Sequence, residues 1–217
     1  GAKLRFVPNG IEPGFWREGR PEATRERLGI ASEDLVASFV GTVGMAHGLS
    51  TLLSAAEILA ARGLQLKILV VGDGAERANI EAEMHRRGLE NVRFTGLVPR
   101  EEARDILCAS DIAMVLLRRS DVFETVIPSK MLEAFAAGCP VVLGVKGEAK
   151  RILEEAGAGI AVEPEDAEGL AAALGQLANE PERRKEMGLA GRVFVEREYN
   201  RERWATKYLG MIEEAAQ

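Results

Sequence analysis

The stretch 122–142, V-F-E-T-V-I-P-S-K-M-L-E-A-F-A-A-G-C-P-V-V, contains the residues of this chain best suited to chemistry. Its spacing predicts a helix that begins at Ser129, directly after a proline, and ends before Gly138. The first turn of a helix offers free N–H groups and a partial positive charge, which suits a phosphate, and Lys130 adds a full charge there. Glu133, one turn further along, suits the hydroxyl groups of a sugar. The stretch therefore indicates a nucleotide-sugar site.

The ordinary alternative is a solvated helix face with a Lys130–Glu133 pair, which stabilises a helix by only about 0.2–0.5 kcal/mol. On a helical wheel, Lys130 and Glu133 share their face with Ala134 and Ala137. We expect the two alanines to leave room for a ligand, whereas a solvated face usually carries more long polar side chains. The opposite face, toward the core, comprises Pro128, Leu132, Phe135 and Ala136.

Three glycine-containing loops follow predicted strands and are further candidates for ligand contact. Glycines let a ligand approach the backbone, and a helix start after Gly48 suits an anion. Each loop taken singly is weak support, because a plain tight turn explains it equally well. The loops are Phe39–Gly48, Val70–Gly74 and Phe94–Pro99.

The elements that must position these loops are alternating strands and helices. Apolar strands that alternate with helices indicate an α/β fold with a doubly wound, mostly parallel, Rossmann-like sheet, whose ligands lie beyond the carboxyl ends of the strands. The expected strands are 4–7, 35–40, 66–71, 92–95, 112–117, 140–143 and 159–162. The expected helices are 22–28, 49–62, 76–87, 100–109, 129–137, 148–155, 167–179, 181–196 and 201–214.

Composition narrows the class of protein. The 217 residues are enough for one large domain, and 47% hydrophobic with 29% charged residues is typical of a globular chain. A net charge of −6 argues against nucleic-acid binding, and no apolar run is long enough to span a membrane. Cys108 and Cys139 are predicted to be buried thiols in a reducing compartment. Gly1-Ala2 indicates a cleavage scar and hence a piece of a longer protein. The stretch Gly10–Arg20 is the expected domain edge.

The order of motifs resembles the carboxy-terminal, donor-binding half of a retaining GT-B glycosyltransferase of family 4 (group 1), over essentially the whole chain. The family's "P-N-G-V-D", "G-R-x-x-x-x-K-G", "G-x-G", "F-x-G" and "E-A-x-A-x-G-x-P-V" motifs are matched in order. The matching stretches are 7–11, 39–48, 72–74, 94–96 and 133–142. Five matches in the right order and spacing make the resemblance specific.

The chain departs from the family pattern at the positions expected to be most reactive. The Arg and Lys of the first loop fall on Thr42 and His47. The first of the family's two glutamates falls on Thr125, with Glu124 one residue earlier, and the second is Glu133. The sequence Pro-Ser-Lys before Glu133 resembles a subgroup seen in bacterial O-antigen and capsule transferases.

The resemblance implies a role for each candidate residue. Glu133 would bind the ribose hydroxyls, and Ser129 and Lys130 would bind the diphosphate. The loop around Leu97 would touch the base, and either Glu124 or Thr125 would face the donor sugar as the catalytic position. The remaining residues expected to line the nucleotide-sugar site are Thr42, Gly44, His47, Gly72 and Gly74. His47 assists the diphosphate only if it is protonated, and a surface histidine is the alternative.

The resemblance also implies the reaction and its partners. It predicts transfer of a sugar from a nucleotide donor, by resemblance UDP-linked, to a bacterial surface-polysaccharide or lipid-linked acceptor with retained configuration. It implies no metal and no cofactor besides this substrate. The acceptor domain would precede residues 1–217 and be absent here, so we expect this piece to bind nucleotide without turnover. The expected location is cytoplasmic, and a peripheral membrane contact through the missing domain stays open.

Segments 1–20 and 197–217 are interpreted as a first strand with an edge segment and as a terminal helix. The apolar stripe of that helix either packs on the core or meets the missing domain; it comprises Trp204, Tyr208, Met211 and Ile212. Two other functions remain open. The substitutions at Thr42, His47 and Thr125 also suit a non-catalytic nucleotide-binding or regulatory domain. A sugar-nucleotide 2-epimerase would have a similar architecture.

Overall fold

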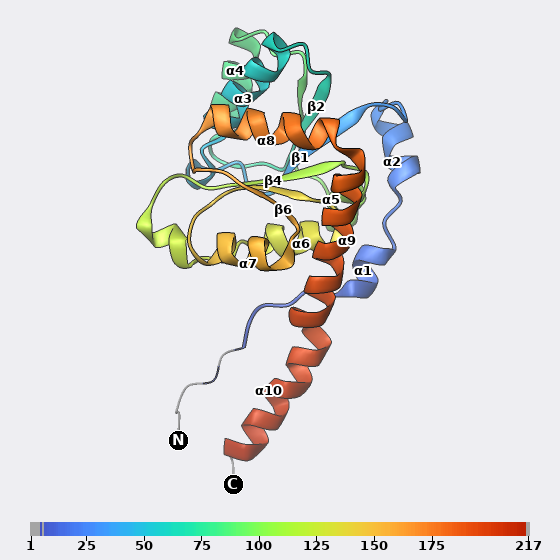
Figure 1. Cartoon of the computed structure of the whole chain (residues 1–217), viewed down its shortest axis with the longest axis vertical. Coiled ribbons are helices and arrows are strands. Elements are labelled where there is room, and N and C mark those ends of the chain that lie inside the picture. The colour runs from blue at the N-terminus through green and yellow to red at the C-terminus, as the bar shows by residue number, and fades with distance from the viewer. Residues whose placement is uncertain (1–4, 6, 216–217) are drawn as a thin grey trace.

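Six parallel strands form a single sheet in the order β3-β2-β1-β4-β5-β6 (Figure 1). The structure is a computed structural model and describes residue 5 and residues 7–215. The strands are β1 (Leu35–Val40), β2 (Leu66–Val71), β3 (Val92–Gly96), β4 (Ile112–Leu116), β5 (Val141–Gly144) and β6 (Gly159–Ala161). The predicted α/β fold with a parallel, Rossmann-like sheet is confirmed.

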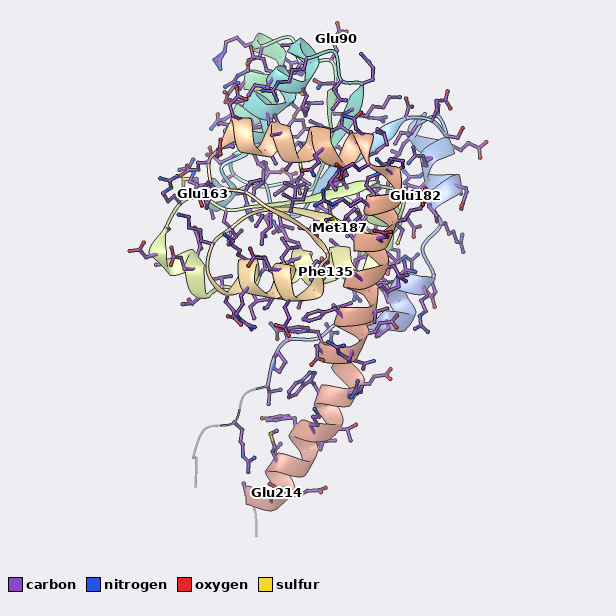
Figure 2. The ribbon with its side chains drawn as sticks, in the orientation of Figure 1. Glu90, Phe135, Glu163, Glu182, Met187 and Glu214 are labelled. Carbon is purple, nitrogen blue, oxygen red and sulfur yellow. The ribbon has the colours of Figure 1, made fainter. Side chains whose placement is uncertain are left out.

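Helices cover both faces of the sheet, because the central strands are apolar on both sides; all five residues of β4 are buried. One face packs against α3 (Leu49–Ala61), α4 (Arg77–Arg86) and α8 (Ala167–Asn179). The other packs against α1 (Pro13–Arg17), α2 (Pro21–Leu28), α5 (Arg100–Cys108), α6 (Ser129–Ala137), α7 (Glu148–Ala156) and α9 (Pro181–Glu198). Figure 2 shows Phe135 and Met187 inside this packing and Glu90 and Glu182 at the surface. Among the described residues, no helix is long and apolar enough to cross a membrane.

The strand order reverses between β1 and β4, which are neighbours in the sheet although β2 and β3 lie between them in the sequence. In an open parallel sheet, a ligand crevice forms beyond the carboxyl ends of the strands at such a reversal. The loop after β1 includes a 3-10 turn, η1 (Met45–His47), and the loop after β4 includes another, η2 (Asp121–Thr125). These two loops and the start of α6 therefore frame the crevice.

The last helix, α10 (Arg201–Ala215), projects beyond the body formed by the sheet and its two helix layers (Figure 1). It contains no buried residue among those described, and Tyr208, Leu209 and Ile212 are exposed. Its base is tied to the start of the chain, because Ile11 bridges to Asn200. The interpretation of this apolar stripe as ordinary core packing is therefore wrong.

Several sequence expectations need correction. Leu4 and Phe6, part of the strand predicted over 4–7, lie outside the described residues, and Val7 is not in a strand. The stretch 10–20, expected to be the edge of the domain, contains helix α1, which was not predicted and whose Trp16 is buried. Cys139 is buried as predicted, but Cys108 is only partly so.

Candidate functional site

Lys130 lies at the start of α6, and its side chain crosses the carboxyl end of β1. Its Nζ is 4.4 Å from the centroid of the Phe39 ring. This Nζ is buried and has no hydrogen-bond partner within the described chain. Burial lowers the pKa of Lys130 to about 8, and the nearby Glu133 opposes this shift. A buried ammonium without an acceptor is costly, and an anion is the group that would pair with it.

The backbone of Gly41 makes room for this ammonium. A Cβ at Gly41 would lie 2.9 Å from the Lys130 Nζ. The φ of Gly41 is +145°, a conformation that residues with side chains rarely adopt. The loop after β1 is therefore shaped around the Lys130 side chain.

Glu133, one turn further into α6, is half-buried. Burial raises the pKa of its carboxyl group, and the positive charges of Arg100, Lys130 and Arg201 oppose that rise. A carboxylate in this environment gains from neutral donors such as hydroxyl groups, which supply charge-assisted hydrogen bonds without a second charge to desolvate. Lys130 and Glu133 thus present an anion-binding and a hydroxyl-binding group on one helix turn.

His47 also contacts the Phe39 ring, with ring centroids 5.5 Å apart and an interplanar angle of 74°. Its Nδ1 is buried without a hydrogen-bond partner in the described chain. Burial, helped by the charge of Lys130, lowers the pKa of His47 to about 4. The imidazole is therefore neutral at pH 7 and adds no positive charge. His47 is only partly exposed at the surface.

The prediction that two alanines of α6 leave room for a ligand is wrong. Ala134 is fully buried and Ala137 is 7% exposed, and both belong to the apolar cluster that also contains Phe194 of α9. The Arg192 guanidinium donates to the Ala137 carbonyl at 2.7 Å. The exposed part of α6 is therefore a narrow strip at its start, and not a whole face.

Gly72 and Gly74 shape the site indirectly. A Cβ at Gly72 would lie 2.1 Å from the Gly41 carbonyl oxygen, and one at Gly74 would lie 2.4 Å from that of Val43. The Val43 N–H also donates to the Asp73 carbonyl at 2.9 Å. These glycines let the loop after β2 interlock with the loop after β1. On the same edge of the sheet, Thr42 and Leu97 are exposed and Gly44 is partly exposed.

The structure separates the two candidate positions for the donor sugar. Thr125 shares a cleft of about 290 Å³ with Ser129 at the start of α6. Glu124 instead lines a small cavity of about 10 Å³, together with Arg118 and Lys146. Thr125 and Ser129 are brought together, whereas Glu124 lies among the loops that follow β4 and β5. The rest of the larger cleft is lined by Val7, Pro8, Asn9, Ile127, Leu132 and Tyr199.

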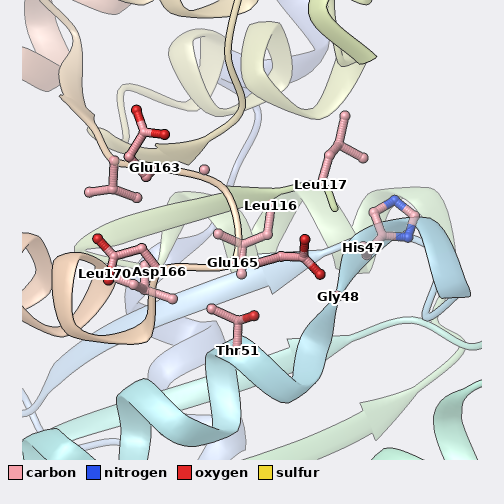
Figure 3. A pocket seen from close by; sticks show the side chains of 11 residues that line it. His47, Gly48, Thr51, Leu116, Leu117, Glu163, Glu165, Asp166 and Leu170 are labelled. Carbon is pink, nitrogen blue, oxygen red and sulfur yellow. The ribbon is translucent and has the colours of Figure 1, made fainter. Parts of the chain in front are cut away.

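Sequence reasoning missed two features beside this edge. Phe39, whose ring contacts both Lys130 and His47, is fully buried in β1, and no local signal marks it as part of a site. A second small cavity of about 10 Å³ lies between the starts of α3 and α8, where the Glu165 side chain points toward Gly48 (Figure 3). The backbone φ of Glu165, +63°, is the only left-handed one among the described non-glycine residues.

Comparison with known proteins identifies relatives across most of the chain. Residues 21–194 match the family described as Glycosyl transferases group 1. A GDP-mannose-dependent phosphatidylinositol monomannoside mannosyltransferase of Corynebacterium glutamicum is 30% identical over 203 residues, 91% of this chain and 52% of that protein. The putative colanic acid biosynthesis glycosyl transferase WcaI of Escherichia coli is 26% identical over 213 residues, 95% of this chain and 51% of that protein. The chain therefore spans about half the length of these relatives.

Solved structures share the fold. Sucrose-phosphate synthase of Thermosynechococcus elongatus superposes with a TM-score of 0.82 at 24% identity, over 100% of this chain and 54% of that one. HepE of Anabaena, solved with UDP and glucose, superposes with a TM-score of 0.81 at 19% identity, over 96% of this chain and 56% of that one. At these identities the likeness concerns the architecture.

Proposed function

Because the chain belongs to the glycosyl transferases group 1 family, we propose that it is the donor-binding part of a glycosyltransferase and binds a nucleotide-diphospho-sugar at the carboxyl edge of its sheet. The buried ammonium of Lys130, unpartnered within the described chain at the start of α6, carries this proposal. A diphosphate there would receive its charge and the free N–H groups of the first helical turn together. Ser129, which begins α6, would add its hydroxyl group.

The positions of the ribose, the base and the sugar follow from the covalent order of the donor. With the diphosphate at Lys130, the ribose lies one helix turn along, where Glu133 accepts from its hydroxyl groups. The base then reaches the loop after β3, where the Leu97 side chain is 80% exposed and offers an apolar surface. The transferred sugar lies toward the cleft shared by Thr125 and Ser129. Thr125, more than Glu124, is therefore the residue we place against the sugar.

A uracil nucleotide is the favoured donor. HepE, which shares this fold, was solved with UDP and with UDP-glucose. We further propose a polysaccharide or lipid-linked acceptor, because relatives named for colanic acid and amylovoran biosynthesis align with most of the chain. Retention of configuration, a cytoplasmic location and the Pro-Ser-Lys subgroup remain predictions of the motif pattern.

Sugar transfer would break the bond between the anomeric carbon and the diphosphate oxygen, and the diphosphate would leave with the bonding electron pair. The oxygen of an acceptor hydroxyl group would form the new bond to that carbon, and its proton would pass to the departing diphosphate. Lys130 would stabilise the charge that develops on this leaving group, and such stabilisation is commonly a large part of catalysis. No metal or further cofactor is assigned in the proposal. The chain spans about half of its relatives, so the acceptor side is assigned to a further domain. We expect these 217 residues to bind donor without transferring the sugar.

Calorimetric titration of the chain with UDP, GDP and ADP tests the proposal. We expect UDP to bind best and Lys130→Ala or Glu133→Ala to weaken UDP binding about 10- to 100-fold, since each removes charge-assisted hydrogen bonds. Lys185→Ala, an exposed lysine paired with Glu182 on α9, is the matched control. Unchanged affinity in both site variants would exclude this site.

An assay of sugar transfer by the full-length protein distinguishes the regulatory alternative from the proposed glycosyltransferase. A non-catalytic domain would bind nucleotide with the same dependence on Lys130 and Glu133, yet no sugar would reach an acceptor. An epimerase would release a free 2-epimer from the sugar nucleotide without any acceptor. The substitutions at Thr42, His47 and Thr125 motivate the regulatory alternative, whereas the epimerase is considered because of its similar architecture.

A further inference from the structure

Glu165 adopts a backbone conformation that its residue type disfavours. It lies in the turn between β6 and α8, and its φ of +63° is left-handed. Glycine would adopt this conformation without cost, whereas a residue with a Cβ loses stability there. Strained residues persist where the surroundings hold them in place, and they concentrate at functional sites. The side chain of Glu165 is therefore the feature to explain.

The Glu165 side chain reaches from its own turn to two other loops. Its Oε2 accepts a hydrogen bond from the Arg119 backbone N–H at 3.0 Å. Its Cγ lies 4.0 Å from the position that a Cβ on Gly48 would occupy, and Figure 3 shows it pointing toward Gly48 at the start of α3. The Arg119 guanidinium in turn donates to the Pro164 carbonyl at 3.4 Å. The turn before α8 is thus hydrogen-bonded to the segment that follows β4.

These hydrogen bonds of Arg119 place its neighbour Arg118 against the loop after β1. The Arg118 N–H donates to the Ala46 carbonyl at 2.8 Å. The Arg118 Cγ lies 3.2 Å from the position of a Cβ on Gly48, so the side chain runs along the start of α3. Arg118 is exposed, which leaves its charge accessible to a ligand. It therefore stands beside His47, which is neutral.

The neighbouring cations are already engaged. The Lys146 ammonium pairs with Glu163 at 2.7 Å, and the Arg119 guanidinium is bonded to Pro164. Thr42 carries no charge. On the β4 side of the crevice, Arg118 is thus the arginine whose side chain lies along the loop after β1.

We propose that Glu165 is a positioning residue, which fixes the Arg118-Arg119 backbone so that Arg118 supplies positive charge to a bound diphosphate in place of the residues at positions 42 and 47. This inference rests on the proposed function, because the ligand is the diphosphate of the donor. A merely structural Glu165 would make the domain more stable. A positioning Glu165 makes the domain less stable and strengthens UDP binding. The two roles therefore predict opposite changes of Tm when Glu165 is replaced.

The test measures the melting temperature and the UDP dissociation constant of the 217-residue chain. We expect Glu165→Gly to raise Tm by roughly 2–4 °C, because the strain is removed, and to weaken UDP binding about three- to tenfold. Glu165→Gln keeps an oxygen that accepts from Arg119 and should bind UDP within about twofold of the unsubstituted chain. Glu168→Gln, an exposed acid of α8 paired with Arg62, is the control and should change neither quantity.

Arg118→Ala completes the experiment. We expect it to weaken UDP binding about tenfold, and adding Glu165→Gly to it should cause no further loss, since both act through one guanidinium. Unchanged affinity in Glu165→Gly, a lowered Tm in that variant, or multiplied losses in the double variant would each overturn the inference. Failure of the unsubstituted chain to bind UDP, GDP or ADP would overturn the proposed function together with it, so the two failures are distinguishable.

Discussion

Lys130 lowers the stability of the free domain. Its ammonium is buried on the Phe39 ring without a hydrogen-bond partner in the described chain, and burial lowers its pKa from 10.5 to about 8. The unfolded chain restores the ordinary pKa, so between these two values the unfolded state binds more protons. The destabilisation by Lys130 is therefore complete below pH 8 and is lost as pH rises from about 8 to 10.5.

Replacing the ammonium by an apolar group of similar length should separate stability from binding. We expect Lys130→Met to raise the free energy of unfolding at pH 7 by about 1–3 kcal/mol, because a buried unpaired charge is removed. The same variant should lose UDP affinity. Urea unfolding at pH 7 measures the first effect, with Lys185→Met as the exposed control. A fall in stability would mean that the ammonium is well satisfied in the free protein.

UDP binding should also depend on pH in a direction set by this lysine. The diphosphate needs the protonated amine, so above pH 8 the free protein must first take up a proton and affinity falls, by up to about tenfold per pH unit. Titrations at pH 7.5, 8.5 and 9.5 measure this. The Lys130→Met variant should show no such trend over that range, and equal slopes in both proteins would assign the effect elsewhere.

At the scale of residues, the sequence predicts groups whose signals are local. Lys130 and Glu133 were predicted because a proline, a charge and a glycine mark the helix that carries them. Phe39 was not, since its contact with Lys130 depends on how β1 and α6 meet in space. The alanines were misplaced because a helical wheel does not reveal that α9 packs on a second side of α6.

At the scale of elements, the loops after β1 and β2 behave as one unit. Gly72 and Gly74 lie so close to the carbonyls of Gly41 and Val43 that a side chain would force them apart. The loop after β1 in turn contacts Lys130. Precise placement of the lysine therefore depends on residues of a different loop, which do not touch it.

The steric part of this dependence is measurable. We expect Gly72→Ala, whose Cβ would lie 2.1 Å from the Gly41 oxygen, to cost about 3 kcal/mol or more and to weaken UDP binding. Gly63→Ala is the control, because Gly63 also has a positive φ but no atom within 4 Å of the added Cβ. It should cost only about 1 kcal/mol. Equal costs in thermal or urea unfolding would refute the interlock.

The bounds of α6 and α8 were predicted correctly because proline, glycine and capping signals delimit them. Helix α1 was missed, since Gly and Pro in the stretch 10–20 were interpreted as the edge of the domain. The two 3-10 turns also escaped prediction, because segments of this length show no periodicity. What failed here are short elements that tertiary contacts stabilise.

At the scale of the whole molecule, the helix-covered sheet and the projecting α10 contribute unequally to stability. The alternation of apolar strands and helices was enough to predict the parallel sheet. The direction of α10 was not predictable, because an apolar stripe at helical spacing is equally suited to a core and to a further partner. In the structure, none of the described residues of α10 is buried, which excludes the interpretation that this stripe packs into the core.

We therefore expect α10 to tolerate polar substitutions. Leu209→Ser and Ile212→Ser together should change the free energy of unfolding by less than about 1 kcal/mol, because both side chains are exposed. Phe135→Ala, fully buried beneath α9, should cost about 3–5 kcal/mol. Thermal unfolding compares the variants. A large loss in the double serine variant would show that α10 folds back on the body in solution.

The interlock of the loops after β1 and β2 has a consequence for recombination between relatives. A segment 41–48 taken from another family member would arrive with carbonyl positions suited to its own neighbouring loop. Unless segment 72–76 came with it, the graft would lack the matching glycine surface at Gly72 and Gly74. The two segments are thus the smallest exchangeable cassette of this site, although they are separated by a whole helix and strand in the sequence.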